Sequence, residues 1–101
     1  MLNLPIDIPQ VELEALCRRY KIRRLALFGS VLRSDFGDTS DVDVLVEFEQ
    51  GAHIGWDIVL IEDELADLLG REVDLNTPAS LSDSFRDRVL QSAQVLYERA
   101  G

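Results

Sequence analysis

The chain has 101 residues, of which 47% are hydrophobic and 29% charged, and its 19 acidic and 10 basic side chains give a net charge of −9 at pH 7. This composition is typical of a small globular domain and argues against disorder. The acidic balance disfavours a nucleic-acid-binding module, because such modules are usually basic. We therefore expect a single domain over residues 1–101 that makes no direct contact with nucleic acid.

The sequence also bears on the cellular compartment. One cysteine cannot form an internal disulfide, which favours a reducing environment. No apolar run approaches the roughly 20 residues of a membrane helix. The first ten residues lack the basic and apolar regions of a secretory signal. We expect a cytoplasmic protein without a membrane partner.

Two elements are predicted in the first third of the chain. Residues 9–21 are predicted to form a helix, because apolar side chains recur there at helical spacing, and Cys17 belongs to this core-facing set. Residues 24–28 are predicted to form a short buried strand. Gly29 and Ser30 follow it directly and are expected to open a helical turn.

The next strand is predicted over residues 41–49, where apolar and polar residues alternate. Alternating side chains of a strand point to opposite faces of the sheet. One face is therefore apolar, and the other carries the acids. The apolar positions are Val42, Val44, Val46 and Phe48, and the acids are Asp41, Asp43, Glu47 and Glu49.

The remaining elements complete the predicted fold. A helix is expected over residues 54–69 with Gly70 as its stop, then a strand over residues 72–75. Residues 80–83 resemble a capping box before a further helix, and residues 95–97 either extend that helix or form a strand. We expect an α+β fold with a small mixed sheet and helices packed mainly on one face.

Charge is unevenly distributed along the chain. Residues 34–70 hold eleven acids and no lysine or arginine. We expect the acids of the helix in this segment, Glu62, Asp63, Glu64 and Asp67, to form a solvated face. A cluster of bases, which could meet phosphates or an acidic partner but suits a helix end better, comprises Arg18, Arg19, Lys21, Arg23 and Arg24.

Three carboxylates are candidates for a metal site. Asp41 and Asp43 lie two residues apart on one strand, so both side chains point the same way. Mg²⁺ prefers one or two carboxylates together with substrate phosphates, and a pair of ions can clamp a phosphoryl group in transfer. Asp74 lies on the third predicted strand, and its side chain points away from the core. If that strand pairs beside the second, Asp74 becomes a third carboxylate able to accept a proton.

Gly29 and Ser30 are candidates for binding phosphate. Glycine lets a phosphate approach the backbone closely. The serine hydroxyl and the amides at the start of a helical turn can then hold the anion.

The motif Gly29-Ser30, ten residues, then Asp41-Val-Asp43 resembles the signature of the nucleotidyltransferase superfamily typified by DNA polymerase beta. The stretch LFGSVLRSDFGDTSDVDVLVEFE, with GREVDLNTP after it, is similar to the minimal nucleotidyltransferase (MNT) group. The resemblance implies that Gly29 and Ser30 hold ATP, that Asp41 and Asp43 bind two Mg²⁺ ions, and that Asp74 completes the site. Arg33 matches the family's GS-x-x-R arginine, which implies a phosphate or partner contact.

Short MNT proteins are similar to antitoxins paired with HEPN-domain toxins. The resemblance implies an adenylyltransferase that moves AMP from ATP to a hydroxyl of a cognate HEPN ribonuclease, with a tyrosine as the expected acceptor, in a hetero-oligomer. Two alternatives stay open. One is a non-catalytic antitoxin that covers the toxin through its acidic surface. The other is a small-molecule nucleotidyltransferase.

Overall fold

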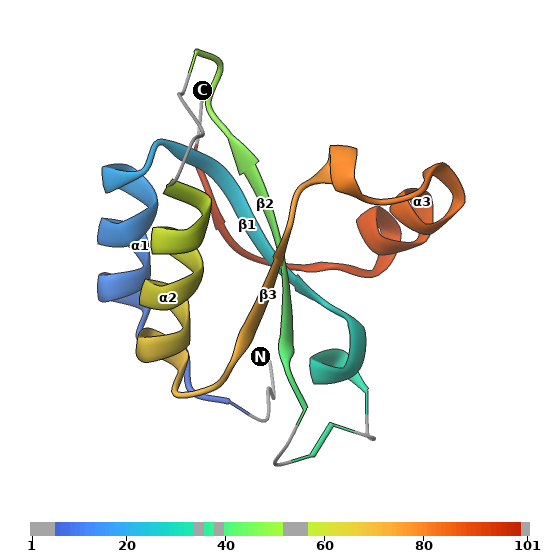
Figure 1. The fold of residues 1–101 in the computed structure, drawn as a ribbon, viewed down its shortest axis with the longest axis horizontal. Coiled ribbons are helices and arrows are strands. Elements are labelled where there is room, and N and C mark those ends of the chain that lie inside the picture. Colours follow the sequence, from blue (N-terminus) through green and yellow to red (C-terminus); the bar gives the residue numbers. More distant parts are fainter. Residues whose placement is uncertain (1–5, 34–35, 38–39, 52–56, 100–101) are drawn as a thin grey trace.

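The computed structural model describes residues 6–33, 36–37, 40–51 and 57–99. In this part of the chain, three α-helices, two 3₁₀ turns and four strands follow one another (Figure 1). Their order is α1 (Gln10–Arg19), β1 (Ile22–Phe28), η1 (Gly29–Leu32), β2 (Val42–Phe48), α2 (Asp57–Leu69), β3 (Val73–Asn76), η2 (Pro78–Ser80), α3 (Asp83–Ser92) and β4 (Gln94–Glu98).

The four strands form one mixed sheet in the order β3-β2-β1-β4. The β2–β3 pair is parallel, and β1 is antiparallel to both of its neighbours. The predicted strands are confirmed with shifted ends, since β1 begins two residues earlier than expected. The tail, for which strand and helix were both open, forms the edge strand β4.

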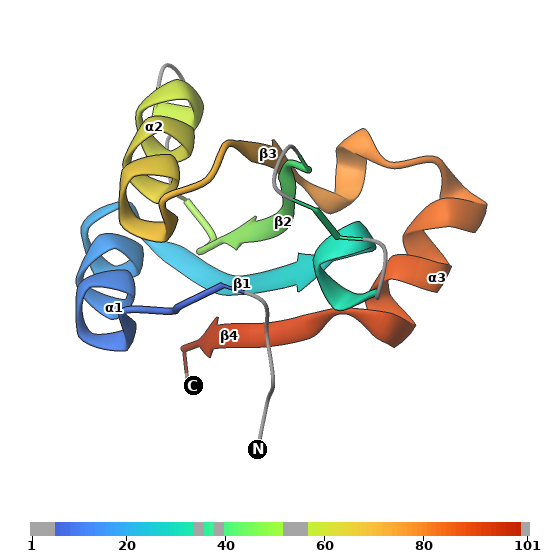
Figure 2. The same cartoon turned by 90° about the horizontal axis from the view of Figure 1, so that it is seen from below.

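One face of the sheet carries the main core. Helices α1 and α2 lie side by side across it (Figure 2). The alternation predicted for β2 places its valines here, and Cys17 of α1 is fully buried as expected. The buried side chains of this core are Leu13, Leu16, Cys17, Ile22, Leu25, Leu27, Val31, Val42, Val44, Val46, Ile61, Leu65, Leu69 and Val73.

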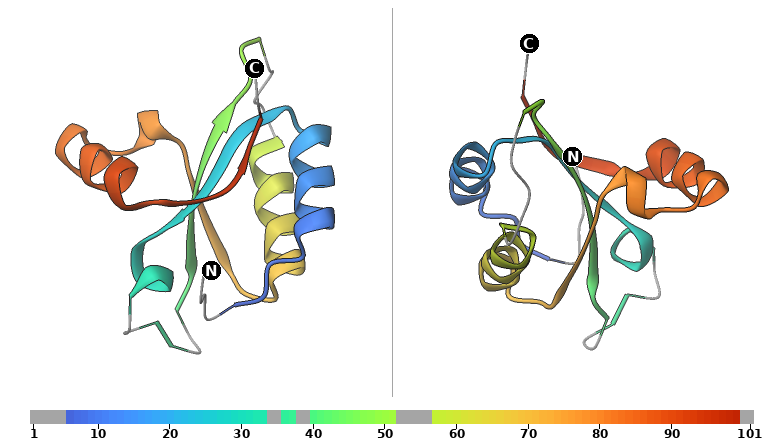
Figure 3. Two further views of the ribbon diagram at one scale, coloured as in Figure 1. Left: turned by 180° about the vertical axis from the view of Figure 1, so that it is seen from behind. Right: turned by 45° about the horizontal axis from the view of Figure 1, so that its top comes forward.

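The opposite face carries a much smaller cluster, formed by Phe28, Leu45, Leu81 and Val89. Helix α3 and the turn η1 lie on this side of the sheet (Figure 3), and Val31 of η1 packs into the main core. The expected packing of helices mainly on one face is confirmed for α1 and α2, whereas α3 covers one end of the other face. Much of that second face is left to polar residues.

The capping box predicted at residues 80–83 is wrong. Ser80 instead ends η2, where its hydroxyl accepts a hydrogen bond from the Thr77 amide at 3.1 Å. Pro78 starts this short turn, and Ser82 becomes the N-cap residue of α3 without a side-chain cap. The stop predicted at Gly70 is confirmed by its left-handed backbone, with φ of 67°.

The basic cluster is largely paired within the chain. Arg19 meets Glu64 of α2 at 2.6 Å, and Arg24 meets Glu47 at 2.9 Å. Arg18 and Arg23 pair with Glu14 and Glu47 in the same way. These ion pairs are partly exposed, so each contributes at most about 1 kcal/mol. Their geometry favours the structural interpretation of the cluster.

In the part of the chain that the structure describes, no helix has both the length and the apolar character needed to cross a membrane.

Candidate nucleotide and metal site

Two of the candidate carboxylates are neighbours on the second face of the sheet. Asp43 lies on β2 and is directly opposite Asp74 of the parallel strand β3. On its other side, Asp43 is opposite Phe28, the last residue of β1. Residues paired across strands share a face, so the carboxyl groups of Asp43 and Asp74 lie side by side. Asp41 immediately precedes β2 and is exposed. The predicted pairing of the second and third strands, which places Asp74 beside Asp43, is therefore confirmed.

Gly29 brings the backbone of the first motif against the second. It directly follows β1 and has φ of 76°, a conformation that favours glycine. A Cβ atom at this position would lie 2.2 Å from Oδ2 of Asp43, well inside van der Waals contact. A side chain here would therefore force the Asp43 carboxylate to move, and glycine instead lets the backbone pack directly on that carboxylate.

Ser30 and Arg33 belong to the turn that begins at Gly29. Ser30 belongs to the turn η1 that Gly29 begins, as predicted for the helical turn. Arg33 is the C-cap residue of η1, and its amide donates a hydrogen bond to the Ser30 carbonyl at 2.9 Å. Its guanidinium acts electrostatically on Asp43. All six candidate residues therefore lie at or beside one end of the sheet.

The surroundings of Asp43 disfavour its ionisation. Partial burial raises the pKa of Asp43 above its ordinary value, and the neighbouring charges of Asp74 and Asp41 raise it further. The positive charge of Arg33 opposes this shift. A site of this kind gains stability from a bound cation, because the cation offsets the repulsion.

The donor set fits magnesium held jointly by protein and substrate. Among the described residues, no group of three or more His, Cys, Asp or Glu side chains is arranged to hold a metal ion by itself. Mg²⁺ is ordinarily bound by one or two carboxylates together with substrate phosphates, so a complete protein cage is not needed. Gly29 brings the backbone, which can approach a phosphate closely, directly beside the Asp43 carboxylate.

Sequence reasoning missed a residue that holds the loop before Asp41. Arg71 donates hydrogen bonds to the carbonyls of Gly37 and, at 3.0 Å, of Ser40. Its guanidinium also lies 4.4 Å from the centroid of the Phe36 ring. These contacts join residues more than thirty positions apart. Nothing local in the sequence marks them.

The helix acids are more than a solvated face. Glu62 of α2 accepts a hydrogen bond from the Leu75 amide at 3.1 Å, which secures the outer edge of β3 next to Asp74. Glu64 accepts hydrogen bonds from Tyr20 and Arg19, and these lower its pKa, the tyrosine more strongly. The expectation is therefore wrong for Glu62 and Glu64. It holds for Asp63 and Asp67, which are exposed.

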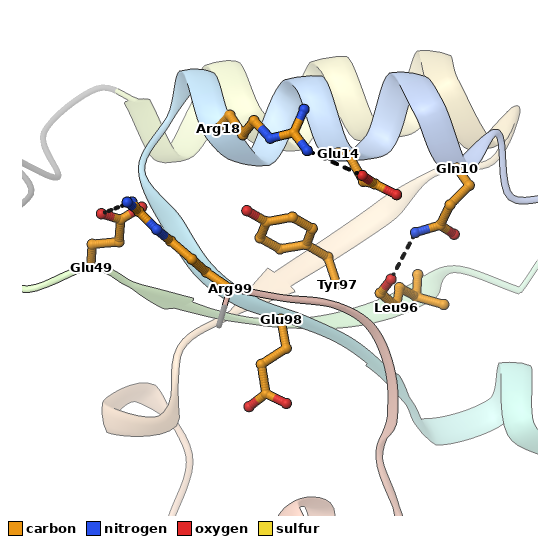
Figure 4. Close-up of a pocket in the computed structure, with 8 residues that line it drawn as sticks. All are labelled: Gln10, Glu14, Arg18, Glu49, Leu96, Tyr97, Glu98 and Arg99. Carbon is orange, nitrogen blue, oxygen red and sulfur yellow. Dashed lines mark hydrogen bonds and ion pairs between the residues drawn. The ribbon is translucent and has the colours of Figure 1, made fainter. Parts of the chain in front are cut away.

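A separate groove of about 710 Å³ lies between α1 and β4 (Figure 4). Its charged residues are already paired, Arg18 with Glu14 at 3.3 Å and Arg99 with Glu49 at 2.6 Å. Gln10 donates to the Leu96 carbonyl of the edge strand. None of the six candidate residues lines this groove, so the chemistry of the motif belongs elsewhere.

Comparison with known proteins agrees with this geometry. The family described as the nucleotidyltransferase domain matches residues 12–96. The protein adenylyltransferase MntA of Thermococcus cleftensis is 35% identical over 79 residues, which cover 78% of this chain and 77% of the relative. The chain therefore belongs to the nucleotidyltransferase family and is an enzyme of nucleotidyl transfer.

Two solved structures indicate which group of nucleotidyltransferases this chain resembles. A candidate minimal nucleotidyltransferase is 34% identical and superposes with a TM-score of 0.70, covering 83% of this chain and 85% of that one. The complex of a tri-AMPylated HEPN toxin of Shewanella oneidensis with an MNT antitoxin has a TM-score of 0.62 at 23% identity, covering 89% and 70%. The first similarity places the chain with the minimal nucleotidyltransferases, and the second shows a shared fold.

Proposed function

We propose that this protein is an adenylyltransferase antitoxin, which binds Mg-ATP on the second face of the sheet and transfers AMP to a HEPN-domain toxin. The observation that carries the proposal is the contact between the two halves of the motif: the backbone of Gly29 packs so closely on the Asp43 carboxylate that a Cβ atom there would lie 2.2 Å from its Oδ2. The relatives are named for protein adenylyl transfer or occur with a HEPN toxin, which supports the protein acceptor.

Each candidate residue has a defined task in this reaction. The backbone at Gly29 and the Ser30 hydroxyl hold the triphosphate, and Arg33 contacts a phosphate. Asp41 and Asp43 would hold two Mg²⁺ ions, which supply charge neutralisation for the attacking and leaving oxygens. Asp74, beside Asp43, accepts the proton of the acceptor hydroxyl.

The transfer is an in-line displacement. The acceptor oxygen bonds to the α-phosphorus of ATP as the bond to pyrophosphate breaks, and the hydroxyl proton passes to Asp74. We propose a tyrosine as the acceptor, supplied by the partner within a hetero-oligomer. Positioning and electrostatic stabilisation supply most of the catalysis. We place the reaction in the cytoplasm, where ATP is available and where the single cysteine stays reduced.

The test is intact-mass spectrometry of the protein encoded by the adjacent gene, as the candidate toxin, after incubation with this protein, ATP and Mg²⁺. The Asp41→Asn/Asp43→Asn variant is compared with Asp63→Asn/Asp67→Asn, which removes the same two charges from the exposed side of α2. We expect wild type and the α2 variant to add whole AMP units. The motif variant should add none.

Other results would contradict the proposal. No mass gain with wild type, with complexes formed equally by wild type and the motif variant, would show an antitoxin that acts by binding. AMP transfer to a small molecule with no gain on the toxin would show a different acceptor class.

A further inference from the structure

An aromatic side chain stands beside the proposed site without a role in it. Phe85 of α3 packs against Phe28, with ring centroids 6.2 Å apart and ring planes at 71°. Phe28 is itself buried, whereas Phe85 keeps 45% of its surface exposed. Phe28 is directly opposite Asp43 in the β1–β2 pair and directly precedes Gly29. Phe85 is thus one side chain away from the candidate catalytic carboxylate.

The position of Phe85 is fixed by its neighbour. Arg86 donates hydrogen bonds to the Pro78 carbonyl at 2.6 Å and to the Leu81 carbonyl at 3.0 Å. It also pairs with Asp83 at 3.2 Å. These contacts tie the first turns of α3 to η2. They occupy the guanidinium of Arg86, and they hold Phe85 in place.

The exposed ring is not part of an apolar stripe. The other strongly exposed apolar residue of α3 among those described is Leu90. Five residues at 3.6 per turn separate the two side chains by roughly 140° around the helix. A helix that docks into a protein groove presents its apolar residues on one face. Phe85 is therefore better suited to a small planar ligand than to a docking helix.

We propose that Phe85 is the platform on which the purine base of the nucleotide stacks, a proposal that rests on the nucleotide-binding function above. Residues paired across strands have Cβ atoms roughly 5 Å apart, and the ring of Phe85 lies one aromatic contact beyond Phe28. In the proposed complex, the ribose bridges the separation between the Phe85 ring and the phosphate site, because it joins the base to the α-phosphate. With the phosphates at Gly29 and Asp43, the base reaches the exposed ring.

The test is isothermal titration calorimetry in the presence of Mg²⁺ with two probes. One is α,β-methylene-ATP, whose α–β linkage cannot be cleaved, and the other is tripolyphosphate, which lacks a base. The variants are Phe85→Leu, which keeps an apolar contact with Phe28, Phe85→Trp, which keeps a ring, and Leu90→Ala as the control on the same helix. Thermal unfolding confirms that each is folded.

Stacking on one aromatic ring is worth enough to change affinity roughly fivefold or more. We expect Phe85→Leu to weaken binding of the ATP analogue by at least that factor and to leave tripolyphosphate binding unchanged. Phe85→Trp should restore the affinity for the analogue, and Leu90→Ala should match wild type for both probes.

Three results would overturn the inference alone. These are equal binding of the analogue by wild type and Phe85→Leu, an equal loss of both probes, or a loss of HEPN-toxin capture with nucleotide affinity unchanged, which would assign the ring to the partner. Failure of wild type to bind either probe would overturn the proposed function together with the inference.

Discussion

The two faces of the sheet differ in what they bury. The first face is covered by α1 and α2 and holds fourteen buried side chains, many of them at 0% exposure. The second face holds a four-residue cluster beside the carboxylates of the motif. Strand β2 serves both, because alternate residues point to opposite sides. The core side chains and the site carboxylate therefore occupy alternate positions of β2. A substitution on one face can change stability or chemistry without changing the other.

The first face stabilises the folded protein, whereas the charged site on the second face opposes folding. Full burial of a leucine or valine contributes about 1.5–3 kcal/mol, so the first face supplies most of the stability. On the second face, partial burial and like charges raise the pKa of Asp43, which means that its ionisation opposes folding. The protein tolerates this cost at the place where a bound cation would offset it.

The largest effect is expected on the second face, from Asp43→Asn. Loss of a metal-binding carboxylate should lower the rate of AMP transfer by roughly a hundredfold or more, with little loss of folding stability. Pyrophosphate release measures the rate, and urea unfolding measures stability. Asp63→Asn on the exposed side of α2 is the control. A variant that transfers AMP at the wild-type rate would contradict the role of Asp43.

The opposite pattern, a loss of stability with ligand affinity retained, is expected on the first face from Leu65→Ala. Leu65 is fully buried, so its truncation should lower the free energy of unfolding by about 2–5 kcal/mol. The folded fraction should retain wild-type affinity for Mg²⁺ and nucleotide. Urea unfolding and calorimetry test both parts. A tenfold loss of affinity in the folded protein would show that the faces are coupled.

A smaller effect is expected at the boundary of the motif, from Gly29→Ala. A left-handed alanine costs about 1–2 kcal/mol, and here its Cβ would also collide with Asp43. Gly51→Ala is a matched control, since Gly51 has φ of 86° and nothing within 4 Å of its Cβ position. We expect both variants to lose stability and only Gly29→Ala to lose AMP transfer. Equal activity in the two would remove the steric argument.

The smallest effect is expected from pH. Because the pKa of Asp43 is raised in the folded protein, its stabilising contribution is present below the ordinary aspartate value and is lost as pH rises through the folded pKa. Without Mg²⁺, Asp43→Asn should therefore gain stability relative to wild type between pH 3 and pH 7. Urea unfolding at several pH values measures the difference. A constant difference would contradict the raised pKa.

Local sequence pattern predicted much of this arrangement. The alternation in β2 assigned Val42 to the core and Asp43 to the open face, and the pairing of β2 with β3 then brought Asp74 beside Asp43. Motif spacing alone identifies Gly29 as a candidate. Such features depend on short periods and on residue types with few alternatives, such as a glycine before a turn.

The missed features depend on contacts between distant segments. Arg71 holds the loop before Asp41, and Glu62 caps the edge of β3, through hydrogen bonds that only the tertiary fold creates. The placement of α3 on the second face follows from the path of η2, which also displaced the predicted capping box. The contact between the rings of Phe85 and Phe28, on which the inference about Phe85 depends, is likewise not visible in the sequence.

The most direct test of the division between the faces is a crystal structure of the protein with Mn²⁺ in place of Mg²⁺ and with α,β-methylene-ATP. Anomalous scattering would locate the metal independently of the rest of the map. We predict Mn²⁺ between the carboxylates of Asp41 and Asp43, with the triphosphate against Gly29 and Ser30. Metal or triphosphate bound away from this face, with Asp43 unoccupied, would contradict the account.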